Sequence, residues 1–339
     1  MQTTLLLNCI FLFKNGVTKF NRHKFTSQPF LIGISGDSGT GKTTFANLMT
    51  EVFGRHNSTI LNGDDMHKWC RNHSNWIEFT HLNPLANNLQ SEYRDLCRLK
   101  IGRQIMRREY DHSSGTFNRS TVRDPNRLVI FEGLHAFYLP EIRDLFDLKV
   151  FIDTDIQLAD HWKILRDSRR RGHDIEHIRQ QIQKRRSDRQ KYIEFQKILA
   201  DIIISPYNKA PISRPGESGV NVELAFKMMF RKTFFLDEII QAFQAIPSLK
   251  MEHCFNHHGE QELDIEGNIY VKDVNKIAAL FLPELEELGI RPIWVSGPLG
   301  IVQFLVVLSV VISIRSNDLS RLLRMQNDFE PWHSMSVSR

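Results

Sequence analysis

Residues 30–44 read FLIGISGDSGTGKTT and contain the pattern that decides the fold. An apolar run ends at a glycine-rich stretch that fits GxxxxGK[ST], and apolar residues at helical spacing follow it. The order strand, loop, helix is the context in which this pattern binds phosphate, because successive backbone N–H groups and a helix N-terminus point at the phosphate oxygens. The residues expected to bind nucleotide are Gly36, Asp37, Ser38, Gly39, Thr40, Gly41, Lys42, Thr43 and Thr44.

Two side chains of this phosphate loop carry specific chemistry. Lys42 can reach the β and γ phosphates of a nucleoside triphosphate, and the Thr43 hydroxyl can bind Mg²⁺. A glycine-rich turn that matches by coincidence is the alternative, but residue types, spacing and context all agree. We therefore expect ATP and Mg²⁺ at this loop.

Apolar runs and helical stretches alternate from this loop to about residue 207. Such alternation is typical of an α/β fold in which a mainly parallel sheet is sandwiched by helices. Further strands are expected at 59–61, 128–131, 149–152 and 202–204, and helices around 85–101, 155–171 and 174–198.

The rest of the chain has a different pattern. Residues 208–219 read NKAPISRPGESG and break any periodicity, which predicts a linker or long loop at 208–221. This divides the chain into an N-terminal extension (1–28), a core (29–207) and a C-terminal α+β extension (222–339). Within the last part we expect a strand at 222–230, a hairpin with its tip at 266–268, a helix at 271–288 and an apolar segment at 294–314.

Composition limits the class of protein. The 339 residues are 41% hydrophobic and 24% charged, as in a globular chain, and the formal net charge of +5 is too small to indicate nucleic-acid binding. The four cysteines form no CxxC pair, which favours a reducing, cytoplasmic setting. The apolar segment 294–314 is interrupted by Gly297-Pro298, so a buried or subunit-interface helix is favoured over a membrane span.

An acidic stretch, 63–68, follows the second expected strand, and open α/β sheets hold their ligands at this end of their strands. A kinase that acts on a hydroxyl needs a carboxylate there to take the proton as the new O–P bond forms. Asp64 is the expected base and Asp65 the alternate. Asp64 could instead be a helix N-cap or an indirect Mg²⁺ ligand. His67 and Lys68 could contact the acceptor or simply be solvated.

A second acid ends an apolar strand, LVIFEG at 128–133. This arrangement resembles a Walker B motif and brings Glu132 beside the phosphate loop, where it could hold Mg²⁺ or its water shell. The alternative is a strand that ends in a solvated glutamate, but uniformly apolar residues before it predict a central strand.

Residues 163–191 contain eleven Lys or Arg and four acids. A solvated basic helix is the usual meaning of such a run. Here Lys163, Arg166 and Arg171 precede a turn at Gly172-His173, which favours a mobile lid around 163–174 that closes positive charge over the transferring phosphoryl group.

Several motifs in one order resemble the phosphoribulokinase and uridine kinase family of P-loop small-molecule kinases, over roughly residues 30–205. The motifs are GDSGTGKTTF, GDDMHKW, NPLANN, YDHSSG, FEGLHAFY and WKILRDSRRRGHD. EGLH and NPLANN are more similar to the phosphoribulokinase branch. The resemblance implies the P-loop kinase fold, with Asp64 as catalytic base and Glu132 as the Walker B-type acid.

The same resemblance implies further residues of the site. Lys163 and Arg166 would be active-site cations, Arg171 would contact a substrate phosphate, and His67 and His135 would lie near the acceptor. The implied activity is ATP-dependent phosphoryl transfer to a hydroxyl of a small metabolite, a pentose phosphate first and uridine or cytidine second. A non-catalytic, regulatory P-loop nucleotide binder is the alternative from another class. We expect a cytoplasmic homo-oligomer that binds a small-molecule acceptor and no nucleic acid.

Overall fold

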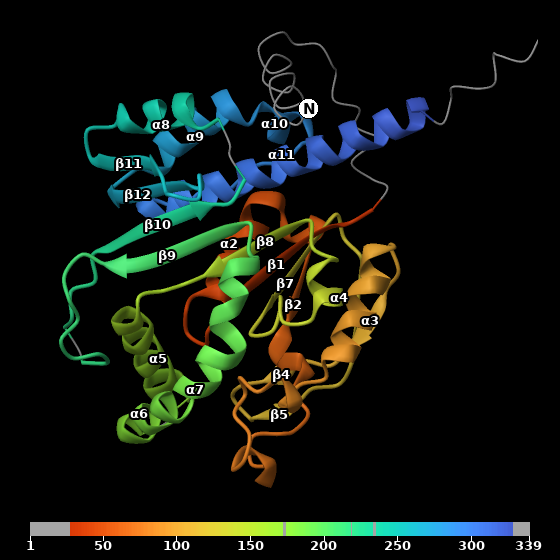
Figure 1. Cartoon of the computed structure of the whole chain (residues 1–339), viewed down its shortest axis with the longest axis vertical. Coiled ribbons are helices and arrows are strands. Elements are labelled where there is room, and N and C mark those ends of the chain that lie inside the picture. The colour runs from red at the N-terminus through yellow and green to blue at the C-terminus, as the bar shows by residue number, and fades with distance from the viewer. Residues whose placement is uncertain (1–27, 172–173, 218, 233–234, 328–339) are drawn as a thin grey trace, which may run out of the picture.

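The structure is a computed structural model that describes residues 28–171, 174–217, 219–232 and 235–327. Its centre is an eight-stranded sheet in the order β11-β12-β10-β9-β8-β1-β7-β2 (Figure 1). Strands β2, β7, β1, β8 and β9 are parallel, and β10, β12 and β11 continue the sheet antiparallel. These strands are β1 (Phe30–Gly36), β2 (Ser58–Asn62), β7 (Leu128–Gly133), β8 (Leu148–Ile152), β9 (Ile202–Asn208), β10 (Leu224–Phe230), β11 (Leu249–Phe255) and β12 (Gln261–Gly267).

Helices cover both faces of this sheet, which is why the central strands are apolar on both sides. In β1, Ile32 and Ile34 belong to a core shared with α2, α8, α9 and α11, whereas Leu31 belongs to a core shared with α3 and α4. The α/β fold with a mainly parallel, helix-covered sheet is therefore confirmed. The helices are α2 (Lys42–Phe53), α3 (Leu89–Lys100), α4 (Pro140–Arg143), α5 (Ile156–Arg171), α6 (Ile175–Lys184), α7 (Arg186–Asp188), α8 (Asp237–Gln244), α9 (Val271–Phe281), α10 (Pro283–Glu287) and α11 (Pro298–Asn327).

A smaller region below the sheet in Figure 1 contains two short antiparallel strand pairs. Strand β3 (Ile105–Arg107) pairs with β6 (Thr121–Arg123), and β4 (Tyr110–Asp111) pairs with β5 (Thr116–Phe117). This region lies between α3 and β7 in the chain and brings the YDHSSG motif next to the end of β2.

Residues 209–217 and 219–223 belong to a long loop between two adjacent strands. β9 and β10 pair from Asn208 with Leu224 to Ile202 with Phe230, so the C-terminal extension continues the central sheet. The loop packs on α5, where the backbone N–H of Ile212 donates to Gln157 Oε1 at 3.0 Å. The strands on either side of 208–221 therefore belong to one sheet, and the division of the chain into a core and an extension stays a prediction.

The predicted position of the hairpin turn, at 266–268, is wrong. Strands β11 and β12 do form a hairpin, but its turn lies at 256–260. Gly267 ends β12 with φ +96°, and a Cβ there would lie 2.1 Å from the carbonyl oxygen of Ser248, so a glycine is needed for the close backbone contact at the end of the hairpin opposite its turn.

Two expected helices are interrupted. The helix expected at 271–288 divides into α9 and α10 at Pro283, which has no N–H to continue the first helix. The helix expected at 174–198 ends as α-helix at Lys184 and continues through α7, a π-helix η6 (Arg189–Ile193) and a 3₁₀-helix η7 (Glu194–Leu199).

The apolar segment 294–314 contributes most of α11, which begins at Pro298 after Gly297 with φ +76°. Residues Pro298–Arg315 are long and apolar enough to span a membrane, yet 67% of them are buried inside the protein. Every residue from 301 to 311 is buried. Figure 1 shows α11 lying across the sheet beneath α8 and α9, as expected for a core helix.

Candidate active site

The phosphate loop joins β1 to α2 with two residues in left-handed conformation. Gly39 has φ +90° and Gly41 has φ +98°. A Cβ on Gly39 would lie 3.2 Å from Cβ of Lys163, so the loop and α5 pack closely. Lys42 is buried, and its Nζ donates to the carbonyl oxygen of Asp37 at 2.7 Å. The phosphate loop therefore curls around the Lys42 ammonium group, which binds a backbone carbonyl of the same loop.

Lys42 and Glu132 lie next to each other at the C-terminal edge of the sheet. Burial lowers the pKa of Lys42, and the carboxylates of Glu132 and Asp64 oppose that shift. Burial likewise raises the pKa of Glu132, opposed by Lys42. The two groups therefore compensate each other in a region from which water is largely excluded.

Thr43 and Glu132 supply the oxygen atoms that Mg²⁺ prefers. The Thr43 hydroxyl donates to Glu132 Oε1 at 2.8 Å, and Glu132 is 3% exposed. Mg²⁺ in kinase sites is usually held by one or two protein oxygens together with substrate phosphates and water. The Thr43 hydroxyl and the Glu132 carboxylate offer a donor set of this kind.

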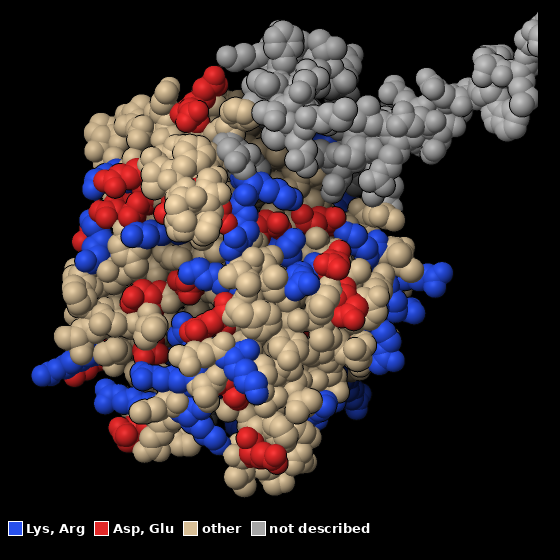
Figure 2. Space-filling view, viewed as in Figure 1, with Lys and Arg blue, Asp and Glu red and all other residues tan. Residues whose placement is uncertain are grey.

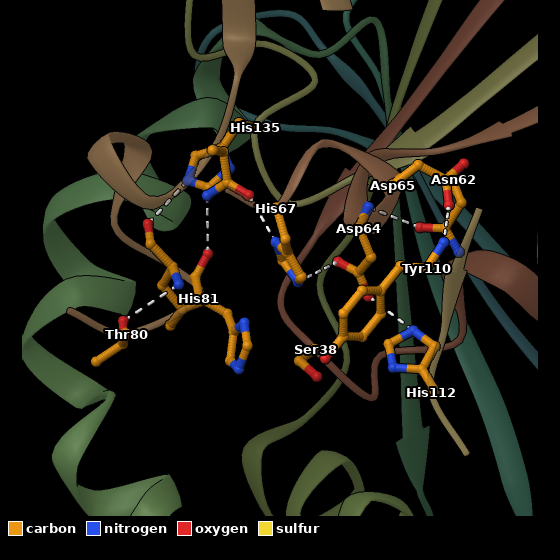
Figure 3. A network of polar contacts seen from close by, with 12 residues as sticks. Ser38, Asn62, Asp64, Asp65, His67, Thr80, His81, Tyr110, His112 and His135 are labelled. Carbon is orange, nitrogen blue, oxygen red and sulfur yellow. Dashed lines mark hydrogen bonds and ion pairs between the residues drawn. The ribbon is translucent and has the colours of Figure 1, made fainter. Parts of the chain in front are cut away.

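Asp64 lies just beyond β2, in a 3₁₀ turn (η3, Gly63–Met66), and its backbone N–H donates to Asn62 Oδ1 at 2.9 Å. Its two carboxylate oxygens face two histidines (Figure 3). His67 Nε2 lies 3.6 Å from Oδ1, and His112 Nε2 lies 3.1 Å from Oδ2. Partial burial acts to raise the pKa of Asp64, but the hydrogen bond from His112 and the nearby His67 and Lys42 outweigh it and hold that pKa well below its usual range. Asp64 is thus ionised near neutral pH.

Asn87, from the NPLANN motif, fixes the orientation of His67. The Asn87 amide group donates to the carbonyl oxygens of His81 and Asn83, so its Oδ1 must accept from Nδ1 of His67, at 2.8 Å. Nδ1 therefore carries a proton, which leaves Nε2 turned to Asp64. The sequence motif had no assigned role, and here it orients a residue beside the expected base.

Aromatic rings form one wall next to His67. The ring of His81 lies 4.0 Å from Trp76 and 4.6 Å from His67, and Trp69 packs against Trp76 at 5.2 Å. Burial and the neighbouring His67 lower the pKa of His81 well below its usual range, so its ring is neutral. Most of this wall comes from residues 69–80, a stretch rich in Trp, Asn and His where we expect substrate specificity to diverge within the family, and that role stays a prediction.

His135 lies deeper than expected for a residue that contacts the acceptor. It is 5% exposed, and its Nε2 donates to the carbonyl oxygen of Leu82 at 2.8 Å. Burial lowers its pKa to about 4, so the ring is neutral. His135 and Asp64 line the same small cavity, together with Asn87. Its expected role in acceptor binding stays a prediction.

Lys163 and Arg166 project from α5 towards the phosphate loop and share one carboxylate. Lys163 Nζ lies 3.3 Å and Arg166 Nε 2.9 Å from the carboxylate of Asp167, and Arg166 Nη2 lies 3.4 Å from Ser38 Oγ. Burial, with help from Arg185, lowers the pKa of Lys163 to about 7. The structure thus brings two of the expected lid cations to the loop.

The remainder of the expected lid is only partly described. Arg171 is the last residue of α5, and Gly172 and His173 lie outside the described residues. Figure 2 shows Lys and Arg side chains gathered over α6 and α7, beside the same end of the sheet. Lid closure and the role of Arg171 remain predictions.

The family model described as the Phosphoribulokinase / Uridine kinase family matches residues 31–213, more than half of the chain. The chain belongs to this family. The match begins in β1 and ends in the loop after β9, so it includes the phosphate loop, Asp64, Glu132 and the cations of α5.

Named members of this family are similar over about half of this chain. A phosphoribulokinase of Synechocystis sp. is 39% identical over 174 residues, which are 51% of this chain and 52% of that protein. A uridine kinase of Bacillus pumilus is 35% identical over 183 residues, which are 52% of this chain and 87% of that protein. The chain thus spans about half the length of the phosphoribulokinase and most of the length of the uridine kinase.

A phosphoribulokinase structure from Rhodobacter spheroides shares the fold. It superimposes with a TM-score of 0.59 at 19% identity, over 78% of this chain and 98% of that one. This match is longer than residues 31–213, so the likeness in fold extends into the C-terminal extension.

Proposed function

We propose that this protein is a P-loop kinase that transfers the γ-phosphoryl group of ATP to a hydroxyl of a small metabolite. One observation carries the proposal: an ionised carboxylate, Asp64, stands at the same edge of the sheet as the phosphate loop, and two histidines hold it. A protein that only bound nucleotide would need Lys42 and Thr43 but would have no use for a base at this place.

The residues of the site have complementary tasks in this reaction. Lys42 neutralises the nucleotide phosphates, and Arg166, which reaches Ser38 of the loop, faces the phosphoryl group that is transferred. The acceptor hydroxyl gives its proton to a carboxylate oxygen of Asp64 as its oxygen attacks phosphorus and the bond to the β-phosphate oxygen breaks. When bound, Mg²⁺ neutralises charge on the phosphates, and Thr43 and Glu132 would hold it.

We infer that the acceptor is a pentose phosphate. Support comes from the similarity to phosphoribulokinases and from the fold match that continues into the C-terminal extension. The similarity to uridine kinases, which covers 87% of one such protein, makes nucleosides the second acceptor class to test.

A screen of acceptors with two variants tests the proposal. Pentose phosphates and nucleosides are each incubated with ATP and Mg²⁺, and formation of ADP and of phosphorylated acceptor is measured. Asp64→Asn should bind ATP normally while kcat falls about 10²- to 10⁴-fold, the usual contribution of a general base. Lys42→Ala should weaken ATP binding itself.

Three results have different meanings. If nucleosides are the only acceptors that are phosphorylated, the pentose phosphate hypothesis is wrong but the proposed kinase function stands. Near-normal turnover by Asp64→Asn would show that the base lies elsewhere. Tight ATP binding by the wild type with no phosphorylated product from any acceptor would favour the regulatory nucleotide binder.

We also propose that the protein is cytoplasmic and forms homo-oligomers, and that α11 serves as a core helix. Burial of residues 301–311 supports the part of this proposal that concerns α11, since a lipid-facing helix would need its apolar surface exposed. Cell fractionation tests the location, and light scattering of the purified chain tests its association. Recovery only in detergent-extracted membranes would contradict the proposed location.

A further inference from the structure

Two segments far apart in the sequence meet at Asp64. Segment A, residues 62–67, carries Asp64, and segment B, residues 107–112, carries His112. Their side chains touch at the Asp64–His112 pair, whose atoms lie 3.1 Å apart. A second contact runs from Arg108 Nη2 to the carbonyl oxygen of His67, at 3.1 Å. The position of the expected base therefore depends on how segment A is fastened to segment B.

Asp65 makes that connection with both of its carboxylate oxygens, and Figure 3 shows Asp65 beside Tyr110 of segment B. Oδ1 accepts from the backbone N–H of Tyr110 at 2.8 Å, and Oδ2 accepts from Arg107 Nε at 3.1 Å. Asp65 is 7% exposed. With each oxygen bound to segment B and the side chain turned away from Asp64's histidines, Asp65 is poorly placed to serve as the alternate base.

Arg107 strengthens the same connection from the other side. Its side chain is 1% exposed, and Nη2 donates to the carbonyl oxygen of Asn62 at 2.6 Å. Arg107 therefore binds segment A on both sides of Gly63-Asp64, at Asn62 and at Asp65. The guanidinium also binds both carboxylate oxygens of Glu92, at 2.9 and 3.1 Å, and Asp95 at 3.3 Å, which anchors it to α3. A buried cation with this many acceptors has one orientation.

We propose that Asp65 is a positioning residue for phosphoryl transfer: it holds segment A against segment B so that Asp64 and His112 stay paired. The inference rests on the proposed kinase function, because Asp64 must be the base for its position to affect turnover. Asp65 touches neither the phosphate loop nor the nucleotide-binding residues, so its effect should reach the reaction only through Asp64.

The test compares Asp65→Asn, Asp65→Ala and the control Asp95→Asn. The asparagine can still accept from Tyr110 but no longer offers a charge to Arg107, and alanine loses both contacts. We expect kcat to fall about 10- to 100-fold in Asp65→Asn and further in Asp65→Ala, with the KM for ATP changed less than about twofold, because small displacements of a catalytic group cost this much. Asp95→Asn removes a contact to the same guanidinium from α3 and should leave kcat near the wild-type value.

A pH profile separates positioning from a general loss of structure. Titratable groups from several elements lie around Asp64: His67, His81, Tyr110, His112 and His135, together with Lys42 and Glu132. When the pairing with His112 weakens, the pKa of Asp64 rises, so the acid limb of kcat/KM should move to higher pH in Asp65→Asn and stay in place in Asp95→Asn.

Hydrogen exchange gives a readout that does not depend on turnover. In Asp65→Asn, amides of 107–112 should exchange faster, while those of α2 should not change. If the wild type phosphorylates no acceptor, the proposed kinase function fails, and exchange alone then decides whether Asp65 fastens the two segments. Equal loss of kcat in Asp65→Asn and Asp95→Asn, an unmoved acid limb, or unchanged exchange in 107–112 would each overturn the positioning role.

Discussion

Gln196 should be among the most sensitive positions of the core, although it touches no expected ligand. It is fully buried, and its side chain makes four hydrogen bonds that use its whole capacity. Oε1 accepts from Ser35 Oγ at 3.0 Å and from the N–H of Phe137 at 2.8 Å. Nε2 donates to the carbonyl oxygens of Leu134 and Tyr192, both at 2.8 Å. Gln196 therefore ties the end of β1, where the phosphate loop begins, to the chain just after β7.

Gln196→Met keeps the approximate volume and removes all four bonds. Three of the four bonds are buried, and they involve the Ser35 hydroxyl, the Phe137 N–H and the Leu134 carbonyl. Each buried polar group left without a partner lowers the free energy of unfolding by about 1–3 kcal/mol. With partial relaxation we expect a loss of roughly 3–6 kcal/mol in the free energy of unfolding, out of a total on the order of 5–15 kcal/mol. ATP affinity should fall as well, because Ser35 directly precedes the loop.

Urea denaturation of the wild type, Gln196→Met and the exposed control Gln180→Met measures the effect. Gln196→Glu tests the direction in which stability should change with pH. Its buried carboxyl should have a raised pKa in the folded state, so the protonated, folded form is favoured at low pH, and stability should fall as pH rises through that pKa. A loss below about 1 kcal/mol in Gln196→Met would refute the reasoning, since the lost bonds would then have been replaced at no cost.

Two other predictions concern charge and packing. The pKa of Lys163 lies at about 7, and a bound triphosphate favours the charged form of this residue. ATP binding near pH 8 should therefore take up more protons in the wild type than in Lys163→Met. Calorimetry in buffers of different ionisation enthalpy measures the difference in proton uptake, and equal uptake by the two proteins would contradict the prediction. Phe304 of α11 is fully buried, and its ring centroid lies 5.3 Å from that of Phe243 and 5.9 Å from that of Trp294. Phe304→Ala should therefore reduce the free energy of unfolding, measured by denaturation, by about 3–5 kcal/mol. A loss below about 1 kcal/mol would mean that α11 is not part of the core.

Local patterns in the sequence predicted the parts of the site that depend on one element each. The glycine-rich pattern placed a loop before α2, and the acids at the ends of apolar strands placed Asp64 and Glu132 at one edge of the sheet, because the C-terminal ends of parallel strands share that edge. Strand bounds were within a few residues for the same reason: a buried strand is a short apolar run.

Residues that act through partners distant in sequence could not be predicted in this way. His112 reaches Asp64 only because a small hairpin folds under β2, and Asn87 orients His67 across 20 residues. The hairpin tip at Gly267 was misplaced because a glycine that serves a close backbone contact and a glycine that serves a turn look the same in one sequence. YDHSSG and NPLANN were visible as motifs, but their tasks required the tertiary contacts.

The placement of α11 has a consequence for synthesis of the chain on the ribosome. The apolar side of α2, with Phe45 and Met49, shares its core with α11, and Gln303 Nε2 donates to the carbonyl oxygen of Leu48 across 255 residues of sequence. At about 5–20 residues per second, translation leaves that side of α2 uncovered for tens of seconds after α2 itself has emerged. Contacts of such long sequence separation also form slowly. We expect the nascent protein to depend on chaperones until α11 is released and docks, and to aggregate when translation stops before residue 311.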